Sequence, residues 1–332
     1  MRDLVRDDRR MGRFANLGTA PFSRLVFCCL PNGFNSHPGG RRIQATDAQE
    51  PSRSYVGEQA VLRVTWWMML GMAASAAFEA LCVHLRLPAS AELVYECGWY
   101  SALFAFMAYL ACREFGTSWQ DLVPLRRVSA RLIAPVLAIT LGVFVASIPL
   151  VAICRRVLPH LPVDDLDLSR TLSLPIQYVC ISLLPAIFEE AVCRGIVLQA
   201  LLAADMSERR AILFSAFLFA AIHFSLVGLP SRFVFGVLVA WMFVRTGSLL
   251  PGMLMHAVNN AIVVALCQTD RLPAPISDWL GPDGNSMPLA VIVCAGLALG
   301  VMGVVAFRRV LAAQVRVTEV DEATSYVLDR AA

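Results

Sequence analysis

The chain has 332 residues, of which 58% are hydrophobic and 16% charged, whereas soluble domains carry roughly 25% charged residues. Together with a mean hydropathy of +0.63, this composition excludes an ordinary soluble domain, which cannot bury that much apolar surface. The net charge of +3 is too small to indicate nucleic acid binding, and we expect no nucleic acid partner.

The first 60 residues are polar and rich in Arg, Gly, Pro, Asp and Ser. Their one apolar patch, 25–30, is far too short to span a bilayer and lacks the segment order of a signal peptide. We therefore predict that 1–60 form a disordered cytoplasmic N-terminal tail.

Long apolar segments fill most of the remaining chain. A helix needs about 20 apolar residues to cross a hydrocarbon core of about 30 Å. On that test we find about eight candidate spans: 64–85, 94–112, 132–154, 172–203, 211–229, 232–246, 249–267 and 287–307. The fourth is too long for one span, and we expect it to break near Pro185 or to continue as an amphipathic end. The prediction is an all-α, polytopic integral membrane bundle with about eight transmembrane helices and the lipid bilayer as its partner.

Arginines set the predicted orientation, because basic residues gather on the cytoplasmic side of membrane helices. Most of the arginine clusters fall on one side of an eight-span arrangement, and Arg155 and Arg156 are the exception. We therefore predict a multi-pass protein of the plasma membrane with both termini cytoplasmic. Its predicted parts are the tail 1–60, two spans and a cytoplasmic loop in 61–130, a core in 131–310 with its motifs in 172–267, and a cytoplasmic tail 311–332.

Ionisable groups within three of these spans are the main functional signal. Each one costs on the order of 3 kcal/mol at bilayer depth, which makes such groups candidates for function. Glu190 and Arg194 stand four residues apart on one helical face, in the favourable order for an ion pair. This pairing would leave the neighbouring Glu189 as a free carboxylate able to take a proton from water. The alternative is that all three form a structural ion-pair network.

Two histidine clusters follow. His223 comes one helical turn after Phe219, and His256 and Asn260 share one face of the next-but-one span. The latter pair offers an imidazole and an amide to a developing oxyanion. Alternatively, His223 is a core residue, and His256 with Asn260 supplies ordinary hydrogen bonds between membrane helices. The coincidence of the three clusters favours the catalytic interpretation.

These motifs resemble a known family. The order Glu-Glu-x-x-x-Arg, Phe-x-x-x-His and His-x-x-x-Asn is similar to that of the CAAX protease and bacteriocin-processing family, the type II CAAX prenyl endopeptidases with their lysostaphin resistance protein A-like domain. All three motifs match in order within about 172–267. The resemblance implies an eight-helix membrane protease with a site open to the cytoplasmic side and to lipid. It also implies that Glu189 and His223 activate water while His256 and Asn260 hold the oxyanion.

A metal is the open question for this site. Glu189, His223 and His256 are candidate zinc ligands, because two nitrogens and one oxygen suit zinc with an open water position. The same residues also suffice without a metal, and no short-spaced His-Glu-x-x-His motif is present. We favour a mechanism without a cofactor and keep a divalent metal, zinc, as the alternative.

The predicted function is an intramembrane CAAX-type endopeptidase, which hydrolyses a peptide bond in a membrane-associated or lipidated peptide or protein near the cytoplasmic face. The alternative from another class is a catalytically silent membrane scaffold or immunity factor with the same fold. A transporter that uses Glu190 and Arg194 as a gate is a third possibility.

Overall fold

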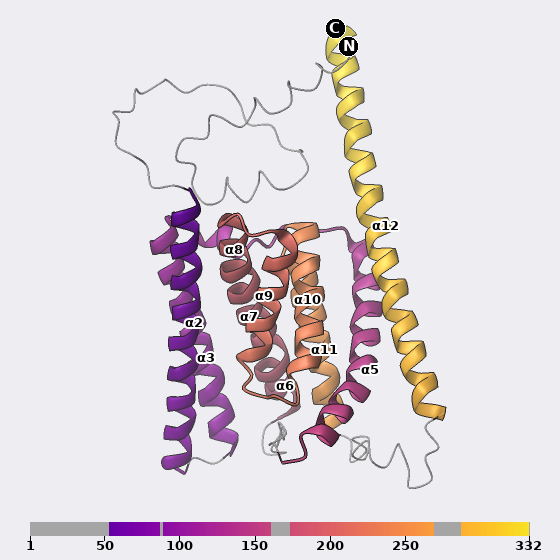
Figure 1. Ribbon diagram of the computed structural model, residues 1–332. Helices are drawn as coiled ribbons and strands as arrows, with labels where there is room; N and C mark the ends of the chain where they lie inside the picture. The colour runs from indigo at the N-terminus through magenta and orange to yellow at the C-terminus, as the bar shows by residue number, and fades with distance from the viewer. Residues whose placement is uncertain (1–52, 87–88, 161–172, 269–286, 332) are drawn as a thin grey trace, which may run out of the picture.

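The computed structural model describes residues 53–86, 89–160, 173–268 and 287–331, and within these ranges every regular element is helical (Figure 1). The predicted tail falls outside the described residues over 1–52. Helix α2 already begins at Arg53, which is earlier than the predicted end of the tail at residue 60. The all-α prediction is confirmed for the described residues.

The helices follow one another in an order that matches the predicted apolar segments. Two of them, η2 and η3, are π-helical. The elements are α2 (Arg53–His84), α3 (Ala89–Phe115), α4 (Trp119–Leu122), η1 (Ala130–Leu132), α5 (Ile133–Val157), α6 (Leu174–Gln177), η2 (Tyr178–Leu183), α7 (Leu184–Glu190), η3 (Ala191–Leu198), α8 (Gln199–Ala203), α9 (Glu208–Ala221), α10 (Leu229–Thr246), α11 (Leu250–Gln268) and α12 (Met287–Ala331).

Three helical stretches in the described part of the chain are long and apolar enough to cross a membrane. They are Ala130–Val157, Leu229–Thr246 and Val293–Gln314, and less than 35% of each is buried inside the protein. Their outward apolar side chains fit a lipid environment, because in water such surface would be unfavourable. The protein is therefore of the integral membrane type and helical throughout its described elements, while the count of about eight spans stays a prediction.

The fourth apolar segment does not break at Pro185, contrary to one expectation. Elements α6, η2, α7, η3 and α8 follow one another without interruption from Leu174 to Ala203. Proline has no N–H to donate to the carbonyl four residues earlier, which here is Ile181. The side chain of Asn260 donates to that carbonyl instead, with Nδ2 3.0 Å from the oxygen. A partner from another helix thus satisfies the backbone where the proline interrupts it.

The fifth segment is shorter than predicted, because α9 ends at Ala221 instead of continuing to residue 229. Phe224 has a φ of 52°, a left-handed conformation that is rare for a bulky residue and incompatible with a continuing right-handed helix. Pro230 then stands in the first turn of α10, where its missing N–H has no helical partner to lose. His223 therefore lies in the turn between two helices rather than within a helix.

The outer helices frame a central group. Figure 1 shows α2 and α3 on one side, α5 and α12 on the other, and α7 to α11 between them. Helix α2 begins and α12 ends at the same end of the bundle, whereas the α9–α10 turn lies at the opposite end. Helix α12 runs on to Ala331 and so includes the predicted tail 311–332 up to that residue.

Candidate functional site

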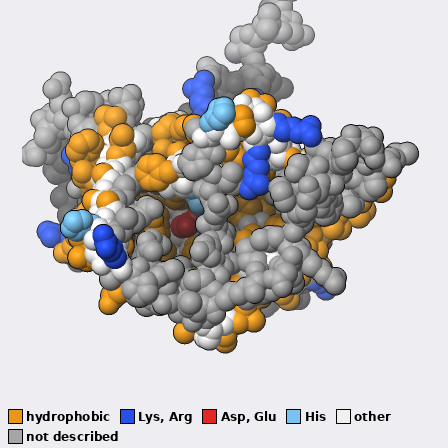
Figure 2. Space-filling view, turned by 90° about the horizontal axis from the view of Figure 1, so that it is seen from below, with side chains coloured by type: hydrophobic (Ala, Val, Ile, Leu, Met, Phe, Trp, Pro, Cys, Tyr) orange, Lys and Arg blue, Asp and Glu red, His pale blue; other side chains and the backbone are white. Residues whose placement is uncertain are grey.

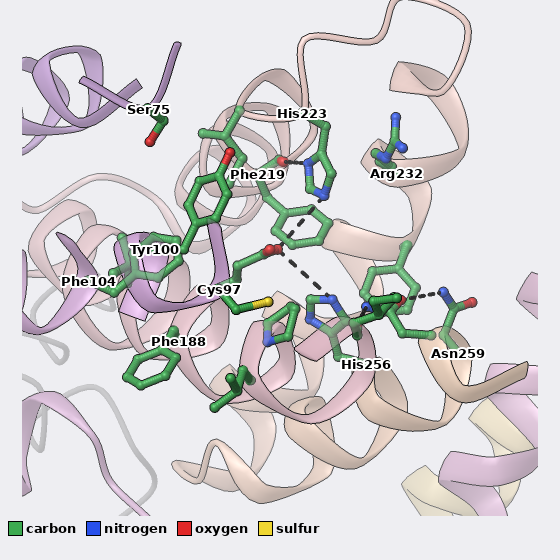
Figure 3. Close-up of a pocket in the computed structure, with 18 of the residues that line it drawn as sticks. Ser75, Cys97, Tyr100, Phe104, Phe188, Phe219, His223, Arg232, His256 and Asn259 are labelled. Atoms are coloured by element: carbon green, nitrogen blue, oxygen red, sulfur yellow. Dashed lines mark hydrogen bonds and ion pairs between the residues drawn. The ribbon is translucent and has the colours of Figure 1, made fainter. Parts of the chain in front are cut away.

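Three predicted site residues from separate elements converge on one point (Figure 3). Glu189 comes from the end of α7, His223 from the α9–α10 turn and His256 from α11. The Oε2 atom of Glu189 lies 3.8 Å from Nε2 of His223 and 4.0 Å from Nε2 of His256. The structure thus brings together three residues that are 33 or more positions apart in the chain.

His256 is held by the second carboxylate. Its Nδ1 lies 2.9 Å from Oε1 of Glu190, and Glu190 also forms an ion pair of 2.9 Å with Arg194. The side chains of Glu190 and Arg194 are 0% exposed. Because the paired Glu190 carboxylate can only accept hydrogen bonds, Nδ1 of His256 carries the proton. In a neutral ring, the Nε2 lone pair of His256 then points toward Glu189.

His223 is fixed in a similar way by the backbone. Its Nδ1 lies 2.9 Å from the carbonyl oxygen of Phe219, and a carbonyl only accepts, so this nitrogen donates. The Nε2 of a neutral His223 is therefore also a lone pair facing Glu189. The buried Oε2 of Glu189 has no hydrogen-bond partner among the described residues. The two Nε2 atoms and the Glu189 oxygen are thus three hydrogen-bond acceptors around one small space. This arrangement suits a hydrogen-bond donor such as a water molecule.

The ring of Phe219 packs against both imidazoles of the cluster. Its ring makes edge contacts with His223 and His256, at centroid distances of 5.2 Å and 5.7 Å. The guanidinium carbon of Arg194 lies 4.6 Å from the centre of the same ring, a cation–π contact in a dry place. Arg194 also donates from Nη2 to the carbonyl of Gly236 at 3.0 Å. The aromatic residue of the second motif therefore orients members of all three motifs.

Asn260 lines the same cavity, but one of its donors is already used. Its Nδ2 donates to the Ile181 carbonyl, and its Oδ1 accepts from Asn259 at 3.2 Å. An amide nitrogen carries two N–H groups, so one N–H remains for an oxyanion. The bond to Ile181 is the kind of interhelical hydrogen bond that the sequence analysis kept as the alternative role of Asn260.

The cluster lies in a cavity of about 760 Å³. Figure 2, seen from below, shows an acidic side chain and a histidine at the bottom of a hollow. One wall consists of aromatic and aliphatic residues from α3 and α7, including Tyr100, Phe104 and Phe188. Phe224 in the α9–α10 turn is also part of the lining. The cavity therefore opens at the end of the bundle that carries this turn.

The three candidate zinc ligands are spaced more widely than a zinc site requires. A tetrahedral zinc with ligand bonds of about 2.1 Å needs donor atoms roughly 3.4 Å apart. The two distances from Glu189 are 3.8 and 4.0 Å, and no group of three His, Cys, Asp or Glu side chains among the described residues has metal-binding geometry. The residues are of the right type for zinc, but they stand too far apart to hold it without moving.

Sequence reasoning missed two features of the site. The contact of Glu190 with His256 joins α7 to α11, and no local spacing predicts a contact between helices. Arg232 also lines the cavity. Its signal was a charged residue at the start of a candidate span, nine positions after His223.

The fold and the cluster define a helical membrane protein with a buried group of carboxylate and imidazole side chains. Residues 171–262 match the family model described as type II CAAX prenyl endopeptidase Rce1-like, a segment that contains all three motifs. This domain supports assignment of the chain to the CAAX protease and bacteriocin-processing family, but it gives no support to a metalloendopeptidase. No curated protein and no solved structure matches the chain.

Proposed function

We propose that the protein is an intramembrane endopeptidase that hydrolyses a peptide bond in a membrane-associated or lipidated peptide or protein. The family match supports a protease of the CAAX type. The observation that carries the proposal is the position of the buried Glu189 Oε2 within 4.0 Å of both imidazole Nε2 atoms. A carboxylate and two imidazoles around a water-sized space are the groups that general acid–base hydrolysis requires.

In the proposed reaction, Glu189 removes a proton from a water held between it and His223. The resulting hydroxide attacks the substrate carbonyl carbon, and the carbonyl oxygen becomes the oxyanion of a tetrahedral intermediate. Glu189 then gives its proton to the amide nitrogen as the carbon–nitrogen bond breaks. The products are a new carboxyl terminus and a new amine.

The oxyanion is assigned to His256 and to the remaining N–H of Asn260. Because Nδ1 of His256 already donates to Glu190, its Nε2 can donate only when the ring is a doubly protonated imidazolium. The Glu190 carboxylate holds the ring of His256 through Nδ1 and thereby orients its Nε2 in the cavity. The proposal therefore gives Glu190 a role beyond pairing with Arg194.

This route needs no metal, and a zinc-dependent route is the alternative. If zinc were bound, Glu189, His223 and His256 would hold it, with Glu190 and the Phe219 carbonyl orienting the two imidazoles. Zinc would supply a polarised water and a Lewis acid. Activity that survives extensive chelation, with no metal in the purified protein, would support the metal-free route. Loss of activity that only added zinc restores would support the alternative.

The predicted cytoplasmic termini and the predicted cytoplasmic opening of the site do not fit the fold together. The cavity opens at the end opposite to the start of α2 and the end of α12 (Figures 1 and 2). If both termini are cytoplasmic, the cavity opens on the opposite side of the membrane. If the cavity opens to the cytoplasm, both termini lie on the opposite side. The two predictions are therefore alternatives in this fold. Reporter fusions to both chain ends, combined with labelling of a cysteine introduced at Leu226 in a cysteine-free background, decide between them.

The substrate and the activity are tested together by comparing membrane peptides from cells that contain the wild type or Glu189→Gln. The wild type should produce fragments that Glu189→Gln does not. The matched control is Glu208→Gln, whose carboxylate pairs with Arg245 and is predicted to leave the fragments unchanged. If Glu189→Gln produced the same fragments as the wild type, the proposed chemistry would be wrong, and an unchanged cellular effect would favour the scaffold function.

A further inference from the structure

Asn259 is a polar residue of the cavity to which the proposed reaction gives no role. It lies on α11 and lines the cavity, and it is half-buried, so its side chain is accessible from the cavity. Figure 3 shows Asn259 on one side of His256 and the aromatic residues Phe104 and Phe188 on the opposite side. A peptide that extends across His256 and away from the aromatic wall therefore reaches Asn259.

A chain of hydrogen bonds determines which atoms of Asn259 stay available. The Ile181 carbonyl only accepts, so Asn260 contacts it through Nδ2 and turns its Oδ1 toward Asn259. That oxygen also only accepts, so Asn259 meets it through Nδ2, at 3.2 Å. The Oδ1 of Asn259 and its second N–H have no hydrogen-bond partner among the described residues. Asn259 therefore presents an acceptor oxygen in a fixed orientation.

The neighbouring helices add further acceptors to the cavity. Helix α5 packs against α10 and α11, and Ser147 of α5 and Ser231 of α10 line the cavity. Both hydroxyls already donate to backbone carbonyls, Ser147 to Phe144 at 2.6 Å and Ser231 to Gly228 at 2.8 Å. A hydroxyl has one donor and two acceptor lone pairs, so each serine has only acceptor sites left for a ligand. These helices thus give the cavity neutral groups that suit hydrogen-bond donors.

An apolar peptide offers such donors when its helix is opened. In a helix each backbone N–H pairs with the carbonyl four residues earlier, and at bilayer depth an unpaired backbone group is costly. A peptide bond inside a helix is shielded by its neighbours, so hydrolysis requires a locally opened segment whose N–H groups lack their helical partners. Acceptors on the wall of the cavity can take the place of those partners.

We propose that Asn259 is a substrate-binding residue whose Oδ1 accepts a hydrogen bond from a backbone N–H of the opened substrate segment. This inference rests on the proposed function. Every residue except proline has a backbone N–H. The contact therefore selects an extended backbone rather than a particular side chain, and it excludes proline at the contacted position of the substrate.

Binding is measured on a protein that lacks the proposed general base. The probes are pools of fluorescent decapeptides with randomised apolar side chains. One pool has amide bonds throughout, and in each other pool an ester replaces one amide at a fixed position, which removes a single N–H. Full-length Glu189→Gln protein in lipid nanodiscs should bind one or two ester pools about two- to tenfold more weakly than the amide pool, as expected for one lost hydrogen bond.

The additional change Asn259→Leu removes the acceptor and nearly keeps the volume of the side chain. It should weaken binding of the amide pool to the level of the affected ester pools, so that the difference between amide and ester disappears. The affected ester pools should bind equally with and without Asn259→Leu. This equality also reports that the variant is folded.

Asn259→Asp separates contact with the substrate from contact with Asn260. Aspartate keeps an acceptor oxygen but has no N–H to donate to Asn260, so this variant should keep the difference between the amide and ester pools. The matched control is Ser182→Ala. Ser182 Oγ donates to the Ala257 carbonyl of α11 at 2.6 Å without lining the cavity, so losing this interhelical bond should also keep the difference.

Turnover by the otherwise wild-type protein gives the second measurement. Asn259→Leu should raise KM for the amide peptides about two- to tenfold, as expected for lost ground-state binding. It should leave kcat within about threefold, because Asn260 keeps its bond to Ile181. A lower kcat with unchanged KM would overturn the inference and assign Asn259 to the orientation of Asn260 alone.

Two binding results would also overturn the inference. One is a difference between amide and ester pools that persists at every position in Asn259→Leu, and the other is an equal loss of that difference in Asn259→Asp and Asn259→Leu. Either result would leave the proposed hydrolysis intact. Conversely, membrane peptides unchanged by Glu189→Gln would contradict the hydrolysis without altering the measured binding.

Discussion

The α5–α12 pair and the region around α7 and α11 bury their interiors in opposite ways. The first packs helix backbones together through glycine: a Cβ on Gly142 would lie 2.5 Å from the backbone of Gly300. The second buries the ionisable side chains of Glu190, Arg194 and His256 almost completely. Close packing of small residues is a general solution for membrane helices, whereas buried charge is costly unless it is paired. The comparison indicates that the first region serves helix assembly, whereas the second keeps a network of paired ionisable side chains inside the protein.

The largest expected effect comes from removing the shared carboxylate. Glu190→Ala leaves Arg194 buried without its counter-charge and His256 without its acceptor. Loss of one partner of a buried pair destabilises a protein by about 3 to 5 kcal/mol, so unfolding in detergent should shift by a comparable amount. Glu208→Ala breaks the half-exposed pair with Arg245 and should cost about 0 to 1 kcal/mol. Equal losses of stability in the two variants would show that the buried Glu190–Arg194 pair matters no more for stability than an exposed pair.

A glycine substitution tests the α5–α12 pair, where we expect a smaller loss of stability. Gly142→Ala forces α5 and α12 apart and should cost about 1 to 3 kcal/mol, as overpacking usually does. The matched control is Gly98→Ala on α3, because nothing lies within 4 Å of its added Cβ; helix propensity alone predicts a gain of up to about 1 kcal/mol. The comparison fails if the two glycines respond alike in unfolding measurements.

The smallest expected effect comes from losing the hydrogen bond between Asn260 and the backbone carbonyl of Ile181. Asn260→Ala removes the donor to the Ile181 carbonyl and should cost about 0.6 to 1.7 kcal/mol, the range of interhelical hydrogen bonds in membranes. Adding Pro185→Ala restores a backbone N–H and should recover part of that stability. Because the amide would still be missing from the cavity, the double variant should remain as slow in turnover as Asn260→Ala. Recovery of turnover together with stability would assign Asn260 a purely structural role.

The sequence predicted the helical class and the polar groups of the site because both leave local signals. Long apolar runs indicate membrane helices, and the spacing of Glu190 and Arg194 indicates a pair on one helical face. The end of α9 was missed because it depends on the left-handed conformation of Phe224, a residue type that rarely adopts it. The bond between Glu190 and His256 was missed because it depends on how α7 and α11 pack, which no single segment determines.

The α6–α8 segment shows the same limit. Pro185 predicted a break in the helix, which does not occur, because the consequence of a proline depends on whether a neighbour can satisfy the freed carbonyl. Asn260 does so from α11, and two π-helical stretches flank the residues that carry Glu189 and Glu190. Such stretches are frequent at functional sites. The local sequence therefore indicates where a proline interrupts the hydrogen bonds of the helix. Whether the helix breaks there depends on contacts with other helices.

The most direct test of the account is hydrolysis by the purified full-length protein in water labelled with heavy oxygen, on a peptide identified from the membrane comparison. The wild type should place one labelled oxygen in the new carboxyl terminus. Glu189→Ala and His223→Ala should unfold at the wild-type temperature and lose at least about 100-fold in rate, as expected when a general base or its partner is removed. Wild-type turnover by folded Glu189→Ala would contradict the account.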